Sequence, residues 1–133
     1  MKTVISVLSM LALIFSAMQA SAATKPTLYS ATITHDGKVE AQSPNWIHST
    51  EYFSQENYSA NYKIKLMPGA FQKAPKYCHV STFDNSSFEH TFYGVAKLSS
   101  KPSREEVNVV GLMQGLDRPS GDSSMSFYLV CGK

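Results

Sequence analysis

Apolar and polar residues alternate through most of residues 24–133, and no stretch of this segment shows a persuasive helical period. The clearest alternation runs from Tyr58 to Leu66, where every second residue is apolar or aromatic and the residues between are Ser, Asn and Lys. A period of two predicts a strand with one buried and one solvated face. Comparable segments predict strands over residues 28–34, 39–42, 46–53, 58–66, 76–83, 88–98, 105–113 and 125–131.

Turn-forming residues separate these segments at short and nearly regular intervals. Asp36-Gly37 lies between the first two segments, and Asp-Gly in this position predicts a hairpin because Gly tolerates positive φ. Many short strands with such spacing are typical of an antiparallel sandwich or barrel. We therefore expect an all-β fold, an antiparallel β-sandwich of about eight short strands, in a single domain over residues 24–133.

The alternation also predicts which side chains share an apolar face. These are Tyr29, Ala31 and Ile33 in the first strand, Tyr58, Ala60, Tyr62, Ile64 and Leu66 in the fourth, and Met125, Phe127, Leu129 and Cys131 in the last. Trp46 follows a turn and is larger and more apolar than its neighbours, so we predict that it lies in the core.

The chain begins with the features of a cleavable secretory signal peptide. Met1-Lys2 is a short positive segment, residues 4–18 are apolar apart from three Ser, and Ala20-Ser21-Ala22 is a pattern that a signal peptidase accepts. The apolar run is shorter than the roughly 20 residues of a membrane-spanning helix. We therefore assign residues 1–23 to a signal peptide and expect a secreted or periplasmic protein with no stable membrane insertion.

Charge is nearly balanced along the chain. The sequence has 12 Lys and Arg against 10 Asp and Glu, a formal net charge of +2, and neither sign is clustered. Nucleic acids and anionic membranes are bound through concentrated positive charge, so neither is an expected partner. Aromatic residues are abundant instead, with seven Tyr, seven Phe and one Trp, which suits strands better than helices.

Cys78 and Cys131 are the two cysteines of the chain. In an oxidising compartment, an even pair in a small domain predicts a disulfide. Cys131 shares a face with Phe127 and Leu129, and Cys78 shares one with Val80, so both sulfurs can point into the core. The alternative, a pair of free buried thiols, does not suit an exported protein.

No catalytic, metal or nucleotide motif stands out. The four histidines, His35, His48, His79 and His90, lack the spacing of a zinc site, and no Ser lies in a nucleophile-elbow pattern. We therefore predict no catalytic residue, no metal ligand and no cofactor. An enzyme ranks below a binding or structural protein.

The segment 76–98 is predicted to form a hairpin around a four-residue loop, residues 84–87. In that register one face carries Tyr77, His79, Phe83, Phe88, His90 and Phe92. A core position for Cys78 turns this face outward, where a ligand or another subunit would bind it. The predicted ligand-binding residues are Tyr77, His79, His90 and Phe92. Two alternatives stay open: a second sheet covers the face, or a one-residue slip in register disperses it.

Several short phrases occur in an order that resembles known proteins. They are Asp36-Gly37-Lys38-Val39, Gln42-Ser43-Pro44-Asn45-Trp46-Ile47, Tyr62-Lys63-Ile64, Gly69-Ala70-Phe71, Ala74-Pro75-Lys76-Tyr77-Cys78 and Phe127-Tyr128-Leu129-Val130-Cys131-Gly132. With them the chain resembles small exported bacterial β-sandwich proteins, mostly uncharacterised, and more loosely H-type lectin and phage tail-fibre tip domains. The resemblance implies an antiparallel sandwich with a structural disulfide and transfers no functional residue. Pro44 stands where such sequences often have Gly.

Together these features predict a secreted or periplasmic binding module that recognises a carbohydrate or a protein through an aromatic surface. The same surface would suit a homo-oligomer interface. One alternative is a structural or inhibitory exported protein that acts on another exported protein. A hydrolytic enzyme ranks last.

Overall fold

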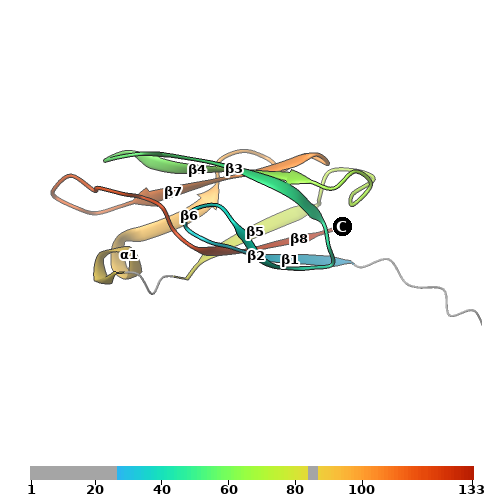
Figure 1. Ribbon diagram of the computed structural model, residues 1–133, viewed down its shortest axis with the longest axis horizontal. Helices are drawn as coiled ribbons and strands as arrows, with labels where there is room; N and C mark the ends of the chain where they lie inside the picture. Colours follow the sequence, from blue (N-terminus) through green and yellow to red (C-terminus); the bar gives the residue numbers. More distant parts are fainter. Residues whose placement is uncertain (1–26, 84–86) are drawn as a thin grey trace, which may run out of the picture.

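Eight strands and one short helix make up the described part of the chain, residues 27–83 and 87–133, in the computed structural model (Figure 1). The elements are β1 (Leu28–Ile33), β2 (Val39–Ser43), β3 (Ile47–Gln55), β4 (Ser59–Leu66), β5 (Tyr77–Thr82), α1 (Phe88–Tyr93), β6 (Gly94–Leu98), β7 (Glu106–Met113) and β8 (Phe127–Gly132). The first sheet has the order β2-β1-β8-β5, and the second has the order β3-β4-β7-β6. All neighbouring strands are antiparallel. The predicted fold class, an all-β antiparallel sandwich of eight strands, is confirmed.

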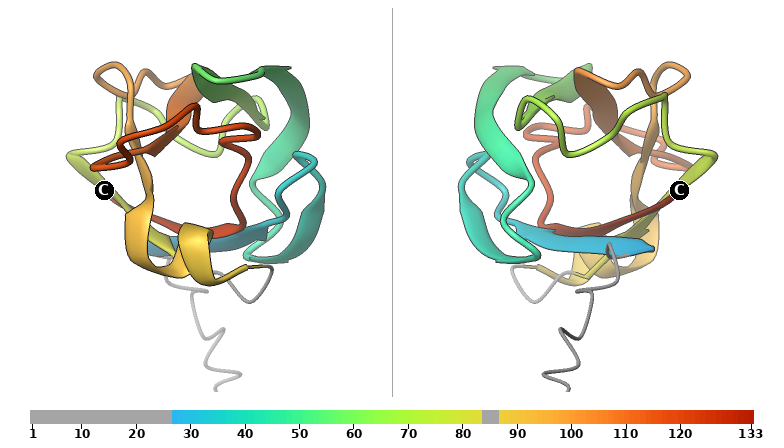
Figure 2. Two further views of the ribbon diagram at one scale, coloured as in Figure 1. Left: turned by 90° about the vertical axis from the view of Figure 1, so that its left-hand side faces the viewer. Right: turned by 90° about the vertical axis from the view of Figure 1, so that its right-hand side faces the viewer.

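Local hairpins and crossovers between the sheets build this topology. β1–β2, β3–β4 and β6–β7 pair as neighbours in sequence, whereas β8 lies between β1 and β5. The predicted turn at Asp36-Gly37 is formed, with Gly37 at a φ of 81° and its N–H donating to the Thr34 carbonyl at 2.8 Å. Seen along the strands, the two sheets lie face to face (Figure 2).

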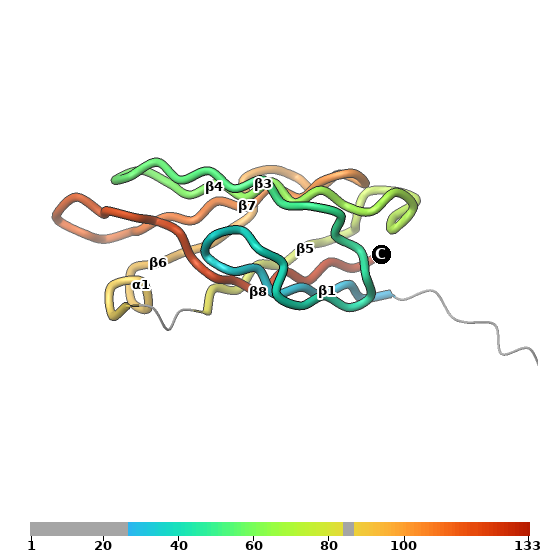
Figure 3. Tube along the Cα trace, in the orientation of Figure 1, coloured from blue at the N-terminus to red at the C-terminus, as the bar shows by residue number. Residues whose placement is uncertain are grey.

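The connections between strands form two ends of the sandwich (Figure 3). The C-terminal end comprises the start of β1, the β2–β3 turn, residues 67–76 and 99–105, and the end of β8. The helical end comprises residues 34–38 and 56–58, α1, and the long loop of residues 114–126. Because antiparallel strands alternate in direction, loops that are far apart in sequence meet at each end.

The apolar faces predicted from the alternation are buried, with one exception. Ile33, Ile64, Phe127 and Leu129 have no exposed surface. Tyr58, in contrast, is 69% exposed. It lies in the β3–β4 turn, where its N–H donates to the Gln55 carbonyl at 3.1 Å, and the regular alternation begins one residue later.

Trp46 is fully buried, as predicted. Its Nε1–H donates to the Ser30 carbonyl at 2.9 Å. Its ring lies edge-on to the rings of Tyr29 and Phe71, with centroid distances of 5.6 and 6.0 Å. This aromatic cluster closes the core at the C-terminal end.

The predicted disulfide joins Cys78 of β5 to Cys131 of β8. The two residues are directly opposite in the β5–β8 pair. Cys131 is fully buried and Cys78 is partly buried against the core. The bond therefore fastens an edge strand to the middle of the first sheet.

The hairpin predicted over residues 76–98 is wrong. β5 pairs with β8 in the first sheet, whereas β6 pairs with β7 in the second. Between them, Phe88–Tyr93 forms α1, because Ser87 caps the helix by accepting a hydrogen bond from the His90 N–H at 3.1 Å. Phe88 and Phe92 are four residues apart, a spacing that puts them on one side of a helix as well as on one face of a strand. In the helix their ring centroids lie 4.4 Å apart.

The predicted signal peptide lies outside the described residues. Within the described part of the chain, no helix has both the length and the apolar character needed to cross a membrane.

Candidate functional site

The four residues predicted to bind a ligand fall into two separate groups. Tyr77 and His79 are exposed on β5, on the outer face of the first sheet. His90 and Phe92 belong to α1 at the helical end. The single outward face predicted from the hairpin does not exist, because the two halves of that segment belong to different sheets.

His90 has a structural role in α1. Its Nδ1 lies 2.6 Å from the Ser87 Oγ, and its Nε2 lies 3.0 Å from the Asp122 carbonyl oxygen. The Nδ1 contact thus belongs to the N-terminal cap of α1, and the Nε2 contact holds α1 against the loop of residues 114–126. Arg118 of the same loop forms an ion pair with Glu89 of α1.

The positions of the first sheet that alternate away from the core carry no formal charge, and Glu40, exposed on β2 where the register shifts, is the single charged residue of its four strands. The positions that alternate away from the core are Leu28, Ser30 and Thr32 on β1, Ala41 and Ser43 on β2, Tyr77, His79 and Ser81 on β5, and Tyr128 and Val130 on β8. A solvent-facing sheet normally places polar and charged residues at such positions. This face instead combines aromatic, small and hydroxyl side chains.

The outer face of the second sheet provides the contrast. Glu51, Lys63 and Lys65 lie side by side across β3 and β4. Lys65 forms an ion pair with Glu51, and the Lys63 Nζ lies 4.0 Å from the same carboxylate. The hydrogen bond from Lys65 holds the pKa of Glu51 below its usual range. Because this charged face is well solvated, the outer face of the first sheet, with its uncharged alternating positions, is the stronger candidate for binding.

Three rings on the first sheet form what we call the aromatic band: Tyr77, Phe83 and Tyr128. The Tyr77 ring lies over Gly132, its cross-strand partner on β8. The Phe83 ring stacks on Tyr128 with a centroid distance of 4.4 Å and an interplanar angle of 30°. Tyr77 and Tyr128 remain 54% and 48% exposed. The rings are therefore held in place by neighbours while part of each stays open to solvent.

A groove runs beside the aromatic band. It has a volume of about 350 Å³ and is lined by Ser30, Ala31, Thr32, Ala41, Gln42, Ser43, Tyr128 and Val130. Its lining combines small and mid-sized side chains of β1 and β2 with the larger Tyr128 and Val130 of β8. The step between small and large side chains creates the recess, and the hydroxyls of Ser30, Thr32 and Ser43 supply polar groups along it.

Sequence analysis missed most of this site. The outward direction of Tyr128 follows from its alternation with Phe127 and Leu129, which are buried. Its contact with Phe83 depends on the pairing of β8 with β5, and no local signal in either segment specifies that pairing. The groove likewise depends on β1 lying between β2 and β8.

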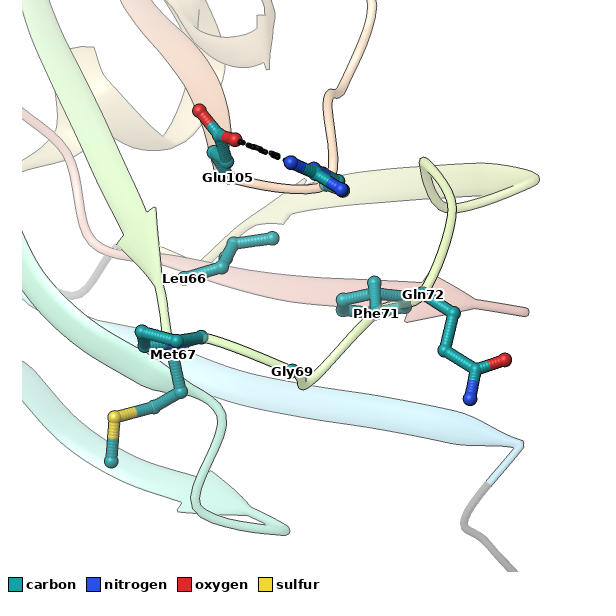
Figure 4. Close-up of a pocket in the computed structure, with 8 residues that line it drawn as sticks. Leu66, Met67, Gly69, Phe71, Gln72 and Glu105 are labelled. Carbon is teal, nitrogen blue, oxygen red and sulfur yellow. Dashed lines mark hydrogen bonds and ion pairs between the residues drawn. The ribbon is translucent and has the colours of Figure 1, made fainter.

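A larger pocket of about 490 Å³ lies at the C-terminal end (Figure 4). Leu66 and Phe71 lie on one side, and Arg104 and Glu105 form an ion pair of 3.3 Å on the other. The lining contains no His, Cys or Ser, and its carboxylate and guanidinium are paired with each other. This arrangement offers no nucleophile and no free general base.

Hydroxyl groups and one carboxylate cluster at the helical end. Asp122 accepts hydrogen bonds from the Ser124 Oγ at 2.6 Å and the Ser54 Oγ at 3.1 Å, and the Ser124 Oγ also contacts the Tyr52 hydroxyl. Ser124 is buried, and His90 reaches Asp122 only through the backbone oxygen. This network fastens the loop of residues 114–126 to β3 and does not have the geometry of a hydrolytic triad.

Across residues 27–83 and 87–133, no three His, Cys, Asp or Glu side chains are grouped so that they could hold a metal ion. Comparisons with protein-family models, curated proteins and solved structures find no match for this chain. The resemblance to exported β-sandwich proteins and lectin-like domains therefore stays a prediction. The candidate site rests on its own geometry.

Proposed function

We propose that this protein is an exported, saccharide-binding module that holds its ligand on the outer face of the first sheet. The observation that carries the proposal is the aromatic band beside a groove with hydroxyl groups, on a face whose alternating strand positions are uncharged. Tyr77, Phe83 and Tyr128 would contact the ligand, and Ser30, Thr32 and Ser43 would hydrogen-bond to it.

The chemistry of sugars matches both the aromatic band and the hydroxyl groups of the groove. A pyranose ring has apolar C–H groups that pack on an aromatic ring, while the hydroxyls of Tyr77 and Tyr128 can bond to the ring's edge. Saccharide hydroxyls need partners that both donate and accept, which Ser and Thr supply. Because the alternating outward positions of the strands are uncharged, a ligand that covers them does not require an ion to be desolvated.

Rings that are already fixed in the free protein favour ligand binding more than mobile rings would. Tyr77 is constrained by Gly132, and Phe83 by Tyr128, so little side-chain entropy is lost when a ligand covers them. Tyr side chains of this kind supply a large contact area at low entropic cost.

Export is the second part of the proposal. The predicted leader over residues 1–23 supports it, and the disulfide between Cys78 and Cys131 is compatible with an oxidising compartment. We expect a mature N-terminus at Ala23 or Thr24, which intact-mass analysis of the exported protein would reveal. An exported fraction that begins at Met1 would contradict cleavage.

A glycan array followed by titration of the best ligand tests the binding site. The test variant is Tyr77→Ser/Tyr128→Ser, which removes two of the three rings of the aromatic band. The control is Phe88→Ser/Phe92→Ser on α1, which removes two aromatic rings that are 71% and 66% exposed. We expect the test variant to lose at least about tenfold in affinity, taking as a guide the roughly 1–3 kcal/mol that a nucleic-acid base contributes when it stacks on an aromatic side chain. The control should bind like the wild type.

The fold of both variants is checked by circular dichroism and thermal melting. No binding to any saccharide, or equal losses in the test and control variants, would overturn the proposal. Sedimentation of the same proteins addresses the protein-binding alternative. A wild-type oligomer that becomes monomeric only in the Tyr77→Ser/Tyr128→Ser variant would assign the face to self-association instead.

A further inference from the structure

The two ends of the sandwich carry opposite charge. The loops of the C-terminal end carry Lys73, Lys76, Lys101, Arg104 and Lys133, with Glu105 paired to Arg104. The described loops and α1 at the helical end carry Asp36, Glu56, Glu89, Asp117 and Asp122, with Lys38 and Arg118. The near-neutral chain is therefore polarised along its length by the fold.

A second pocket concentrates part of the positive charge. It has a volume of about 330 Å³ and is lined by Phe71, Gln72, Lys73, Ala74, Lys76 and Lys133. Three of its lining residues are Lys and none is acidic. None of these three Lys forms an ion pair within the part of the chain that the structure describes. We call this the lysine pocket.

Lys133 of the lysine pocket lies over two aromatic rings. The Lys133 Nζ lies 4.9 Å from the centroid of the Tyr29 ring and 6.0 Å from that of Phe71. Both rings are buried and fixed, with Tyr29 also donating a hydrogen bond to the Ala70 carbonyl at 3.0 Å. A cation held over aromatic rings keeps its remaining donors free for an anion.

The lysine pocket adjoins one end of the aromatic band. Lys76 immediately precedes Tyr77, and Lys133 immediately follows Gly132, on which the Tyr77 ring lies. The Lys76 N–H donates to the Gly132 carbonyl at 2.9 Å, so the two strand ends are fastened together at this corner. One residue of a strand spans about 3.3 Å, which places the pocket within reach of a sugar unit next to the one on Tyr77.

We propose that the saccharide bound by this protein is acidic and that the lysine pocket binds its carboxylate or sulfate group. This proposal rests on the saccharide-binding function proposed above and specifies the class of ligand. Sugar rings lie on the aromatic band and the groove beside it, and the anionic substituent lies at the corner with Lys73, Lys76 and Lys133. An acidic peptide would match the charge but would leave the aromatic band and the hydroxyl groove without a specific role.

The experiment uses the mature protein and an array of uronate-containing, sulfated and neutral oligosaccharides. Each acidic ligand that binds is then compared with its carboxyl-reduced or desulfated form, which keeps the rings and removes the charge. The test variant is Lys73→Gln/Lys76→Gln. The matched control is Lys63→Gln/Lys97→Gln, which removes the same charge from the outer face of the second sheet.

We expect the acidic form to bind about tenfold more tightly than its neutral form, as one or two partly exposed ion pairs allow. The test variant should lose this preference and retain the affinity for the neutral form. The control variant should keep the preference. Raising the salt concentration should weaken only the acidic form's binding to the wild type and the control.

The outcomes separate the two proposals. Equal binding of acidic and neutral forms by the wild type would overturn the acidic specificity and leave saccharide binding intact. Loss of the preference in both Lys variants would show an effect of net charge only and would also overturn it. If an Asp-rich peptide binds at the Lys residues and no saccharide binds the protein, both proposals are overturned. Salt-sensitive self-association that Lys73→Gln/Lys76→Gln abolishes would assign the pocket to the acidic end of a second copy.

Discussion

The ring of Tyr77 covers Gly132 on the neighbouring strand so closely that a Cβ atom at position 132 would collide with it. The backbone of Gly132 is not in the left-handed region, so Ala is acceptable there for the main chain. The position of the Tyr77 ring, and not the backbone conformation, is thus the reason for Gly at position 132. This relationship fixes the first ring of the aromatic band.

Gly132→Ala should displace Tyr77 and destabilise the domain by about 1 kcal/mol, the lower range for overpacking, because the half-exposed ring can move outward. It should also weaken ligand binding. In a Tyr77→Ser background the same substitution should cost almost nothing, and urea unfolding of the four proteins measures this coupling. Equal effects of Gly132→Ala in both backgrounds would show that the ring contact is not the cause.

Trp46 should report directly on folding because it is the single Trp of the chain and is fully buried. Its emission in the native protein should be blue-shifted and inaccessible to iodide, and it should shift to the red on unfolding. Trp46→Phe should destabilise the domain, because the Ser30 carbonyl loses its hydrogen bond inside the core. Trp46→Ala should cost about 3–5 kcal/mol. Native emission that iodide quenches freely would contradict the burial.

The Cys78–Cys131 bond closes a loop with a sequence separation of 53. The chain-entropy model assigns about 4 kcal/mol to a closure of this length. Cys78→Ser/Cys131→Ser should therefore lower the free energy of unfolding by an amount of that order while the circular dichroism remains that of a β protein. Mapping of non-reduced peptides checks the bond itself, and the recovery of two free thiols would refute it.

Asp122 should make stability depend on pH at the acidic side. Partial burial acts to raise the pKa of Asp122, but hydrogen bonds from Ser124 and Ser54 outweigh it and hold the pKa below its usual value. A depressed folded-state pKa contributes stability above the unfolded-state pKa and loses it as the pH falls through the folded value. Asp122→Asn should thus be destabilising by roughly 1 kcal/mol at neutral pH.

The difference between Asp122→Asn and the wild type should shrink as the pH is lowered below about 3.9, the usual pKa of Asp. Chemical unfolding at a series of pH values measures this difference in the free energy of unfolding. Glu40→Gln, at an exposed position on β2, is the control and should show no comparable dependence. A difference that stays constant down to acid pH would contradict the role of the ionised carboxylate.

Local pattern predicted much of the fold because a period of two specifies which side chains face inward. The alternation of Phe127, Leu129 and Cys131 with Tyr128 and Val130 is borne out in β8. The pattern failed over residues 88–93, where the Phe pair suits a helix and a strand equally and Ser87 favours the helix by capping it. The predicted face that joined Tyr77 to Phe92 failed with it.

By itself, the sequence determined the number of strands, the position and inward face of most of them, and the pairing of the two cysteines. Only the tertiary structure decided which strands are neighbours, and therefore that Tyr77 lies on Gly132, that Phe83 stacks on Tyr128 and that Lys73, Lys76 and Lys133 gather at one end. The physical reason is that backbone hydrogen bonds between strands are alike for any pair of residues. Partners and register are selected by the long-range packing of the buried faces, which a pattern along a single strand does not contain.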